Sequence, residues 1–207
     1  MNQWREKSPI ALEEEILKKA KTIFEDFKDF TDGQRVMFLI QRHKEGGETN
    51  NSKLIKKLPR NSDEWFKVLK ELLKEQMTSD LPLRIYACVN NRDFNKAIRK
   101  FKYEQLDADY YDQVQKENFY LDVKNRFIGC LMQPAQRASS NFLFDIDNLE
   151  GVDVLGEMLK TIPEEHIIKT YKTKNGWHMV TKPFNYTTCS LPSSVELKKD
   201  GLLLLSF

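Results

Sequence analysis

Apolar residues recur at helical spacing close to the start of the chain. Ser8 precedes Pro9 there, and this pair suits the cap and the first turn of a helix. The Asp32-Gly33 pair is typical of a turn that ends such a segment. The apolar stripe between them consists of Leu12, Ile16, Ala20, Ile23, Phe24 and Phe27. The pattern predicts a helical lead over residues 1–33 that packs through this stripe.

Short apolar runs bounded by turn residues predict three buried strands. They cover Arg35–Gln41, Leu83–Val89 and the C-terminal run Gly201–Phe207. The polar segment 45–53 after the first run is expected to be a loop. None of these runs is long enough to be a typical helix, so the strands are expected to belong to a sheet.

Helical periodicity dominates the segments between these strands. One helix is expected from Asn61 or Ser62 to about Met77, with Trp65, Phe66, Leu69, Leu72 and Leu73 as its buried stripe. A second helix is expected from Arg92 to about Leu106. The stretch from Tyr110 to Met132 is expected to be helical with interruptions, and a short helix is expected over 152–161.

The segment NFLFDIDN alternates bulky apolar residues with two acids, which predicts a strand. Asp145 and Asp147 then project from one face, roughly 6 to 7 Å apart, which is twice the rise per residue. Phe142, Phe144 and Ile146 point to the other face, into the core. Two carboxylates at this spacing could bind one or two divalent cations. Turn-forming or solvated acids at the end of a strand are the alternative interpretation.

Two β-rich runs, IIKTYKT and WHMVTKPF, surround an Asn175-Gly176 pair that favours a type I′ hairpin turn. In that register His178 lies opposite Thr173, and Lys169 lies opposite Lys182. Two lysines facing each other repel, and a phosphate beside them would relieve that repulsion. The pattern therefore predicts a phosphate site on the face that carries His178.

Composition limits the class of protein. Hydrophobic residues make up 40% and charged residues 31%, so the chain can fold around a core. With 33 basic and 31 acidic residues, the formal net charge is +2, and any polyanion site must be a local patch. Three cysteines without a CxxC pair favour a reducing compartment. The sequence has neither a signal-peptide core nor a run of about 18 apolar residues, so we expect a cytoplasmic protein without a membrane partner.

Taken together, these elements predict an α+β fold with a mixed or antiparallel sheet flanked by helices. We expect a single domain over 1–207. Within it, the helical lead is followed by an α/β portion at 34–140 and by a portion at 141–207 with the acidic strand and the hairpin.

The order FLFDID followed by Gly176-Trp177-His178, with His178 placed 31 residues after Asp147, resembles the first two motifs of the archaeo-eukaryotic primase superfamily. The resemblance covers residues 141–185. It implies a primase-like fold with an RRM-like core. It also implies that Asp145 and Asp147 hold catalytic Mg²⁺ or Mn²⁺, and that His178 contacts the phosphates of a nucleoside triphosphate.

The third motif of that family is an acid that follows an apolar residue. Glu196 follows Val195 and fits this pattern, whereas Asp200 follows Lys199. Both acids remain candidates for the third metal ligand. Further candidates for contacts to phosphate or to a base are Lys169, Lys172, Thr173, Lys174, Trp177 and Lys182.

The resemblance implies a nucleotidyltransferase of DNA replication that acts on single-stranded nucleic acid by a metal-assisted attack of a 3′-hydroxyl on an α-phosphate. Two other functions remain open. One is a non-catalytic module that binds nucleic acid or a protein partner. The other is a metal-dependent phosphodiesterase, because the same two-metal geometry serves hydrolysis.

Overall fold

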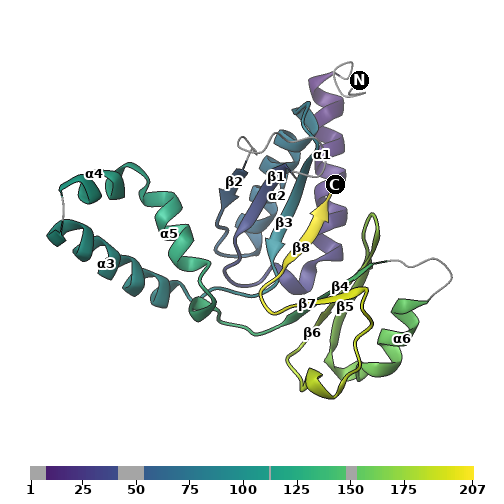
Figure 1. Cartoon of the computed structure of the whole chain (residues 1–207). Coiled ribbons are helices and arrows are strands. Elements are labelled where there is room, and N and C mark those ends of the chain that lie inside the picture. Colours follow the sequence, from purple (N-terminus) through teal and green to yellow (C-terminus); the bar gives the residue numbers. More distant parts are fainter. Residues whose placement is uncertain (1–7, 42–53, 112, 148–152) are drawn as a thin grey trace.

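The computed structural model describes residues 8–41, 54–111, 113–147 and 153–207 (Figure 1). The predicted loop at 45–53 and the first residues of the helical lead lie outside these ranges. The described residues form an α+β fold, as expected from the sequence. Instead of one sheet they contain two four-stranded antiparallel sheets, with strand orders β2-β1-β3-β8 and β5-β6-β4-β7. We call these sheet A and sheet C.

Sheet A contains the three strands expected from short apolar runs. β1 (Met37–Gln41) pairs with β2 (Leu54–Lys57) on one side and with β3 (Leu83–Cys88) on the other, and β8 (Leu202–Ser206) completes the edge. β8 therefore belongs to sheet A although it lies in the C-terminal portion of the chain. This pairing spans more than a hundred positions of sequence, which no local pattern encodes.

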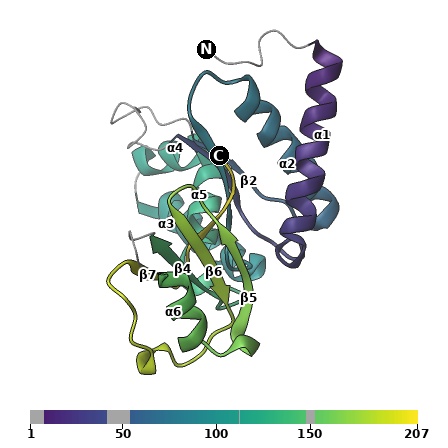
Figure 2. The same cartoon turned by 90° about the vertical axis from the view of Figure 1, so that its right-hand side faces the viewer.

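Two helices cover one face of sheet A, as Figure 2 shows. α1 (Pro9–Asp26) begins where predicted, because the Ser8 side chain accepts a hydrogen bond from the Ala11 amide. α2 (Ser62–Thr78) is capped in the same way by Asn61. Trp65 of α2 is fully buried and meets the edge of Phe24 at 5.8 Å between ring centroids. The stripes predicted for both helices form the main core.

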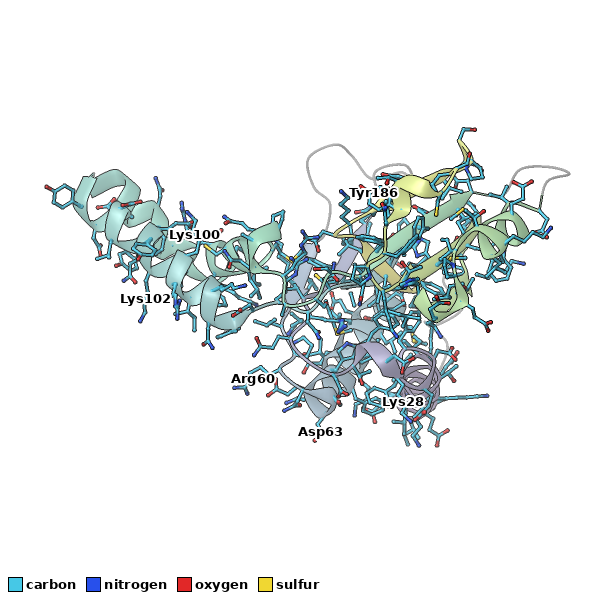
Figure 3. All side chains as sticks on the ribbon, turned by 90° about the horizontal axis from the view of Figure 1, so that it is seen from below. Lys28, Arg60, Asp63, Lys100, Lys102 and Tyr186 are labelled. Atoms are coloured by element: carbon cyan, nitrogen blue, oxygen red, sulfur yellow. The ribbon has the colours of Figure 1, made fainter. Side chains whose placement is uncertain are left out.

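The opposite face of sheet A meets the base of a helical arm. The arm consists of α3 (Phe94–Tyr111), α4 (Gln113–Leu121) and α5 (Val123–Leu131). Buried Ala97 and Leu131 pack there against Phe38 of β1. Lys100 and Lys102 of α3 lie well away from the sheets (Figure 3). The helical segments predicted after Arg92 are thus confirmed, and the predicted interruptions fall between α3 and α4 and between α4 and α5.

Sheet C holds the acidic strand at a central position. β4 (Phe142–Asp147) lies between β6 (Gly176–Thr181) and β7 (Val195–Lys198), with β5 (Ile167–Lys172) at the edge. α6 (Val154–Thr161) covers one face, where Phe144 and Ile146 are buried. The alternation in FLFDID therefore produces the predicted result, with one apolar face and one acidic face.

The hairpin of β5 and β6 exists, but its predicted register is wrong. Tyr171, rather than Thr173, lies opposite His178, and Lys172 lies opposite Trp177. The turn centres on Lys174 and Asn175, with the Thr173 amide donating to the Gly176 carbonyl at 2.8 Å. Among the described residues only Gly33 has positive φ, so the turn is not type I′. The preference of Asn-Gly for a type I′ turn is therefore not realised here, and the observed register places Tyr171 opposite His178.

Polar contacts join the two sheets where the chain crosses between them. The Asn90 amide group donates to the carbonyls of Asn141 and Lys199, both at 3.1 Å. Leu143 of β4 and Val180 of β6 are buried in the same apolar cluster as α1 and α2. The acidic face of sheet C is thereby held against the edge of sheet A.

Candidate functional site

Asp145 and His178 are direct neighbours across sheet C. The antiparallel register of β4 and β6 pairs the two residues, and His178 Nε2 lies 3.3 Å from Asp145 Oδ1. His178 is buried, with 8% exposure, while the Asp145 side chain is 31% exposed. The hairpin strand β6 thus packs directly beside the acidic strand and brings these two residues together.

Glu196 is the neighbour of Asp145 on the other side, because β7 pairs with β4 in register. Lys198, two residues further along β7, reaches both acids. Its Nζ donates to Asp145 Oδ2 at 2.6 Å and lies 3.0 Å from Glu196 Oε2. An ammonium group therefore bridges the carboxylates of two adjacent strands.

These contacts keep Asp145 ionised. The hydrogen bond from His178, followed by that from Lys198, holds the pKa of the Asp145 carboxyl well below its usual range, although partial burial opposes the shift. The two acids in turn raise the pKa of the Lys198 ammonium against the effect of its own burial. The cluster is thus a charged network at neutral pH.

Asp147 lies on the same face of β4, opposite Gly176. It is exposed, and its carboxylate makes no hydrogen bond or ion pair with another described residue. Asp145, Asp147, His178 and Glu196 all line one cavity of about 950 Å³ between the two sheets. The acids and the histidine singled out from the sequence therefore share a site.

Sheet A supplies the opposite wall of this cavity. Ile40 and Arg84, which are paired across β1 and β3, line it together with Tyr86. Arg84 is buried, with 6% exposure. The cavity thus combines carboxylates from sheet C with a guanidinium and a phenol from sheet A, a set of groups that can contact a charged polar ligand.

Asp200 differs from Glu196 in its surroundings. Both of its carboxylate oxygens accept hydrogen bonds from Arg92, at 2.7 and 3.0 Å, and the Arg92 side chain is fully buried. This bidentate pair joins the end of sheet C to the start of the arm. Asp200 lines the cavity as well, but its oxygens are engaged in a structural contact.

The predicted phosphate contacts are divided between different parts of the surface. Thr173 and Lys174 line the cavity with the acids. Lys169 lies over the Phe27 ring at 5.1 Å and, with Lys172, lines a separate groove beside α1. Lys182 is exposed and does not line the cavity. Lys169 is paired with Val180 and not with Lys182. The predicted lysine pair around a phosphate is therefore wrong.

Trp177 points away from the cavity. It alternates with His178 along β6 and packs partly buried in the apolar cluster beneath α6. Its position gives it a packing role on the other face of sheet C.

Sequence reasoning missed Lys198, Arg84 and Tyr171. Lys198 could have been found, because it stands two residues after Glu196 in a short strand and so shares its face. Arg84 and Tyr171 gave no such signal. Their places depend on how the two sheets meet.

The donor atoms at the site suit a hard divalent cation. Carboxylate oxygens are the ligands that Mg²⁺ and Mn²⁺ prefer. Nevertheless, among the described residues no group of three or more His, Cys, Asp or Glu side chains converges at metal-binding distances. Lys198 supplies the positive charge between Asp145 and Glu196 instead.

Comparisons of the chain with protein-family models, with curated proteins and with solved structures give no match. In the described part of the chain, no helix is both long and apolar enough to span a membrane. The case for a function therefore rests on the geometry of the cavity.

Proposed function

We propose that this protein is a primase-like nucleotidyltransferase that uses a divalent cation and nucleoside triphosphates on a single-stranded nucleic acid. The observation that carries the proposal is the position of Asp145 on a central strand, between His178 on one neighbour and Glu196 on the other. The spacing of the sequence motifs and the pairing of their strands in sheet C both point to these residues as the site. Glu196, rather than Asp200, would be the third acid, because Asp200 is engaged by Arg92.

Asp145, Asp147 and Glu196 would hold Mg²⁺ or Mn²⁺ once Lys198 moves away from the acids. When bound, such a cation would lower the pKa of an attacking hydroxyl and neutralise charge on the leaving pyrophosphate. The exposed Asp147 carboxylate offers a first ligand. Asp145, kept ionised by its neighbours, offers the second.

Basic groups around the acids would orient the triphosphate. His178 would turn its Nε2–H from Asp145 to a phosphate oxygen. Lys198 would move from the carboxylates to the phosphates in the same way, since a triphosphate carries more negative charge than the two carboxylates. Arg84 lies on the opposite wall, where it would face the same ligand from sheet A.

One observation favours the second candidate, a non-catalytic module that binds nucleic acid or a protein. Lys198 already pairs with both Asp145 and Glu196, so each of these acids has a cationic partner without any metal. In a binding module this ion-pair network would be structural and permanent. A metal-dependent phosphodiesterase is the third candidate, because the same acids could serve hydrolysis.

The test combines strand extension and strand cleavage with three variants. The wild type is assayed with Mn²⁺, nucleoside triphosphates and a primed or unprimed single strand. Asp145→Asn combined with Asp147→Asn should abolish metal binding and transfer together. His178→Ala should retain metal binding and weaken triphosphate binding by about 1.5 to 3 kcal/mol, the value of a charge-assisted contact. Asp63→Asn, on distant α2 (Figure 3), is the control.

The outcomes separate the three candidates. Extension by the wild type supports the proposed function, and cleavage without extension supports the phosphodiesterase. If the wild type neither binds Mn²⁺ with nucleotide nor alters any strand, the binding module is the better account.

A further inference from the structure

Tyr171 connects the acidic face of sheet C to the backbone of sheet A. Its hydroxyl lies 2.8 Å from His178 Nδ1, across the β5–β6 pair. The same hydroxyl oxygen accepts a hydrogen bond from the Leu204 amide of β8 at 3.1 Å. Its ring meets the edge of Phe27 at 5.0 Å between ring centroids, which fixes the side chain from the other side.

The proton positions at Tyr171 follow from these two contacts. Because the oxygen already accepts from Leu204, the hydroxyl proton needs an acceptor of its own. The acceptor in reach is His178 Nδ1, and burial of an unpaired hydroxyl proton would be costly. Burial raises the pKa of the Tyr171 hydroxyl far above its usual range, so the phenol keeps this proton. Nδ1 therefore accepts.

The other side of the ring gives the same answer independently. His178 Nε2 lies 3.3 Å from Asp145 Oδ1, and an ionised carboxylate can only accept a hydrogen bond. An unprotonated Nε2 would place its lone pair against this carboxylate, so the contact favours a proton on Nε2. A proton on Nε2, facing Asp145, and an accepting Nδ1, facing Tyr171, together define the neutral Nε2–H tautomer of His178.

We infer that Tyr171 is a positioning residue that fixes His178 in the Nε2–H tautomer even when Asp145 is not its partner. The structural basis is the contact of one hydroxyl with both the Leu204 amide and His178 Nδ1. A ring held only by Asp145 would lose its fixed tautomer as soon as that carboxylate turned to another ligand. A ring held by Tyr171 keeps a proton on the nitrogen that faces the cavity.

The consequence for ligand binding rests on the proposed function. When Asp145 engages a cation, His178 would still present a donor to a phosphate oxygen, without having to take up a proton. Removal of the Tyr171 hydroxyl should then weaken triphosphate binding by about two- to tenfold while metal binding is unchanged.

The tautomer itself can be tested without any ligand or activity. The chain has three histidines, so ¹⁵N spectra of histidine-labelled full-length protein are simple, and His178→Gln assigns the relevant signals. Spectra are recorded at about pH 8.5, where an ordinary imidazole is neutral. Protonated and unprotonated ring nitrogens resonate far apart, so the tautomer is read directly.

Wild type and Asp145→Ala should both show one tautomer with protonated Nε2. The double variant Asp145→Ala with Tyr171→Phe should show a mixture of tautomers, because both neighbours that define the proton are gone. Tyr186→Phe in the same Asp145→Ala background is the matched control and should retain the single tautomer. Its ring packs on Phe142, near the other end of β4.

Three results would each overturn the inference. The first is a protonated Nδ1 in the wild type, the second is a mixture of tautomers in Asp145→Ala alone, and the third is a single tautomer in the double variant. None of these results bears on strand extension, so failure of this inference and failure of the proposed function are distinguishable. Phenylalanine keeps the Tyr171 ring on Phe27, and cooperative melting of each variant shows that it is folded.

Discussion

Replacement of Lys198 by methionine tests whether this side chain stands where a cation binds. Its Nζ donates to Asp145 at 2.6 Å and lies 3.0 Å from Glu196, on the adjacent strand. A charge-assisted hydrogen bond contributes about 1.5 to 3 kcal/mol when buried. The Lys198 and Asp145 side chains are 35% and 31% exposed, so solvent screening reduces the expected loss to about 1 kcal/mol.

That loss corresponds to a fall of about 2 to 4 °C in melting temperature for a chain of this size. The two acids would then face each other without a counter-ion, and like charges across a strand pair repel. Mn²⁺ should relieve this repulsion. At ten times its dissociation constant, a bound ligand adds about 1.4 kcal/mol of stability, which is enough to restore the melting temperature.

The assay is thermal melting of each protein with and without Mn²⁺, in the absence of nucleotide. Lys199→Met is the matched control, because it removes the same charge one residue away, where Nζ lies over the Tyr186 ring. Mn²⁺ should stabilise Lys198→Met and leave both the wild type and Lys199→Met almost unchanged. Equal effects of Mn²⁺ on both variants would refute the reasoning.

Three further predictions address the acid face and the backbone. Because the pKa of Asp145 is lowered on folding, its stabilisation is intact above about pH 4 and is lost below it, so Asp145→Asn should flatten the fall of the urea midpoint between about pH 4.5 and 2.5. Asp200→Asn should cost up to about 3 kcal/mol of stability in melts, because it weakens the buried Arg92 pair, and should spare Mn²⁺ binding in titrations with nucleotide present. Glu196→Gln should leave the stability almost unchanged and weaken Mn²⁺ binding in the same titrations. Gly33→Ala should cost about 1 to 3 kcal/mol in urea unfolding, because φ is 83° and a new Cβ would lie 2.7 Å from Asn91; Gly129→Ala, with open space around it in α5, should be neutral or stabilising.

Much of the local structure was predictable from the sequence, because it depends on short-range physics. Ser8 and Asn61 begin their helices through side-chain caps, which the sequence displays directly. The alternation around Asp145 defines a strand with two unlike faces, and the structure has both. These features need no knowledge of distant contacts.

The hairpin register could not be predicted in this way. Asn175-Gly176 favours a type I′ turn, but the observed turn lies one residue earlier and places Tyr171 opposite His178. In that place the Tyr171 hydroxyl reaches Leu204, and its ring reaches Phe27 of the N-terminal segment. Contacts between distant segments therefore outweighed the local preference of the turn.

The division into two sheets could not be predicted from local sequence patterns either. β8 pairs with β3, and nothing in the run of leucines indicates this partner. The same pairing brings Arg84 and Tyr86 of β3 opposite the acids. The acids and the histidine of the site are thus visible as motifs, whereas its second wall is a product of topology.

The most direct test of the proposed site is a crystal structure of the full chain with Mn²⁺ and a nucleoside triphosphate. The account predicts anomalous manganese density on Asp145, Asp147 and Glu196, with Lys198 and His178 turned toward the phosphates. Density at another place, or Lys198 still paired with Asp145 at saturating Mn²⁺ and nucleotide, would contradict it.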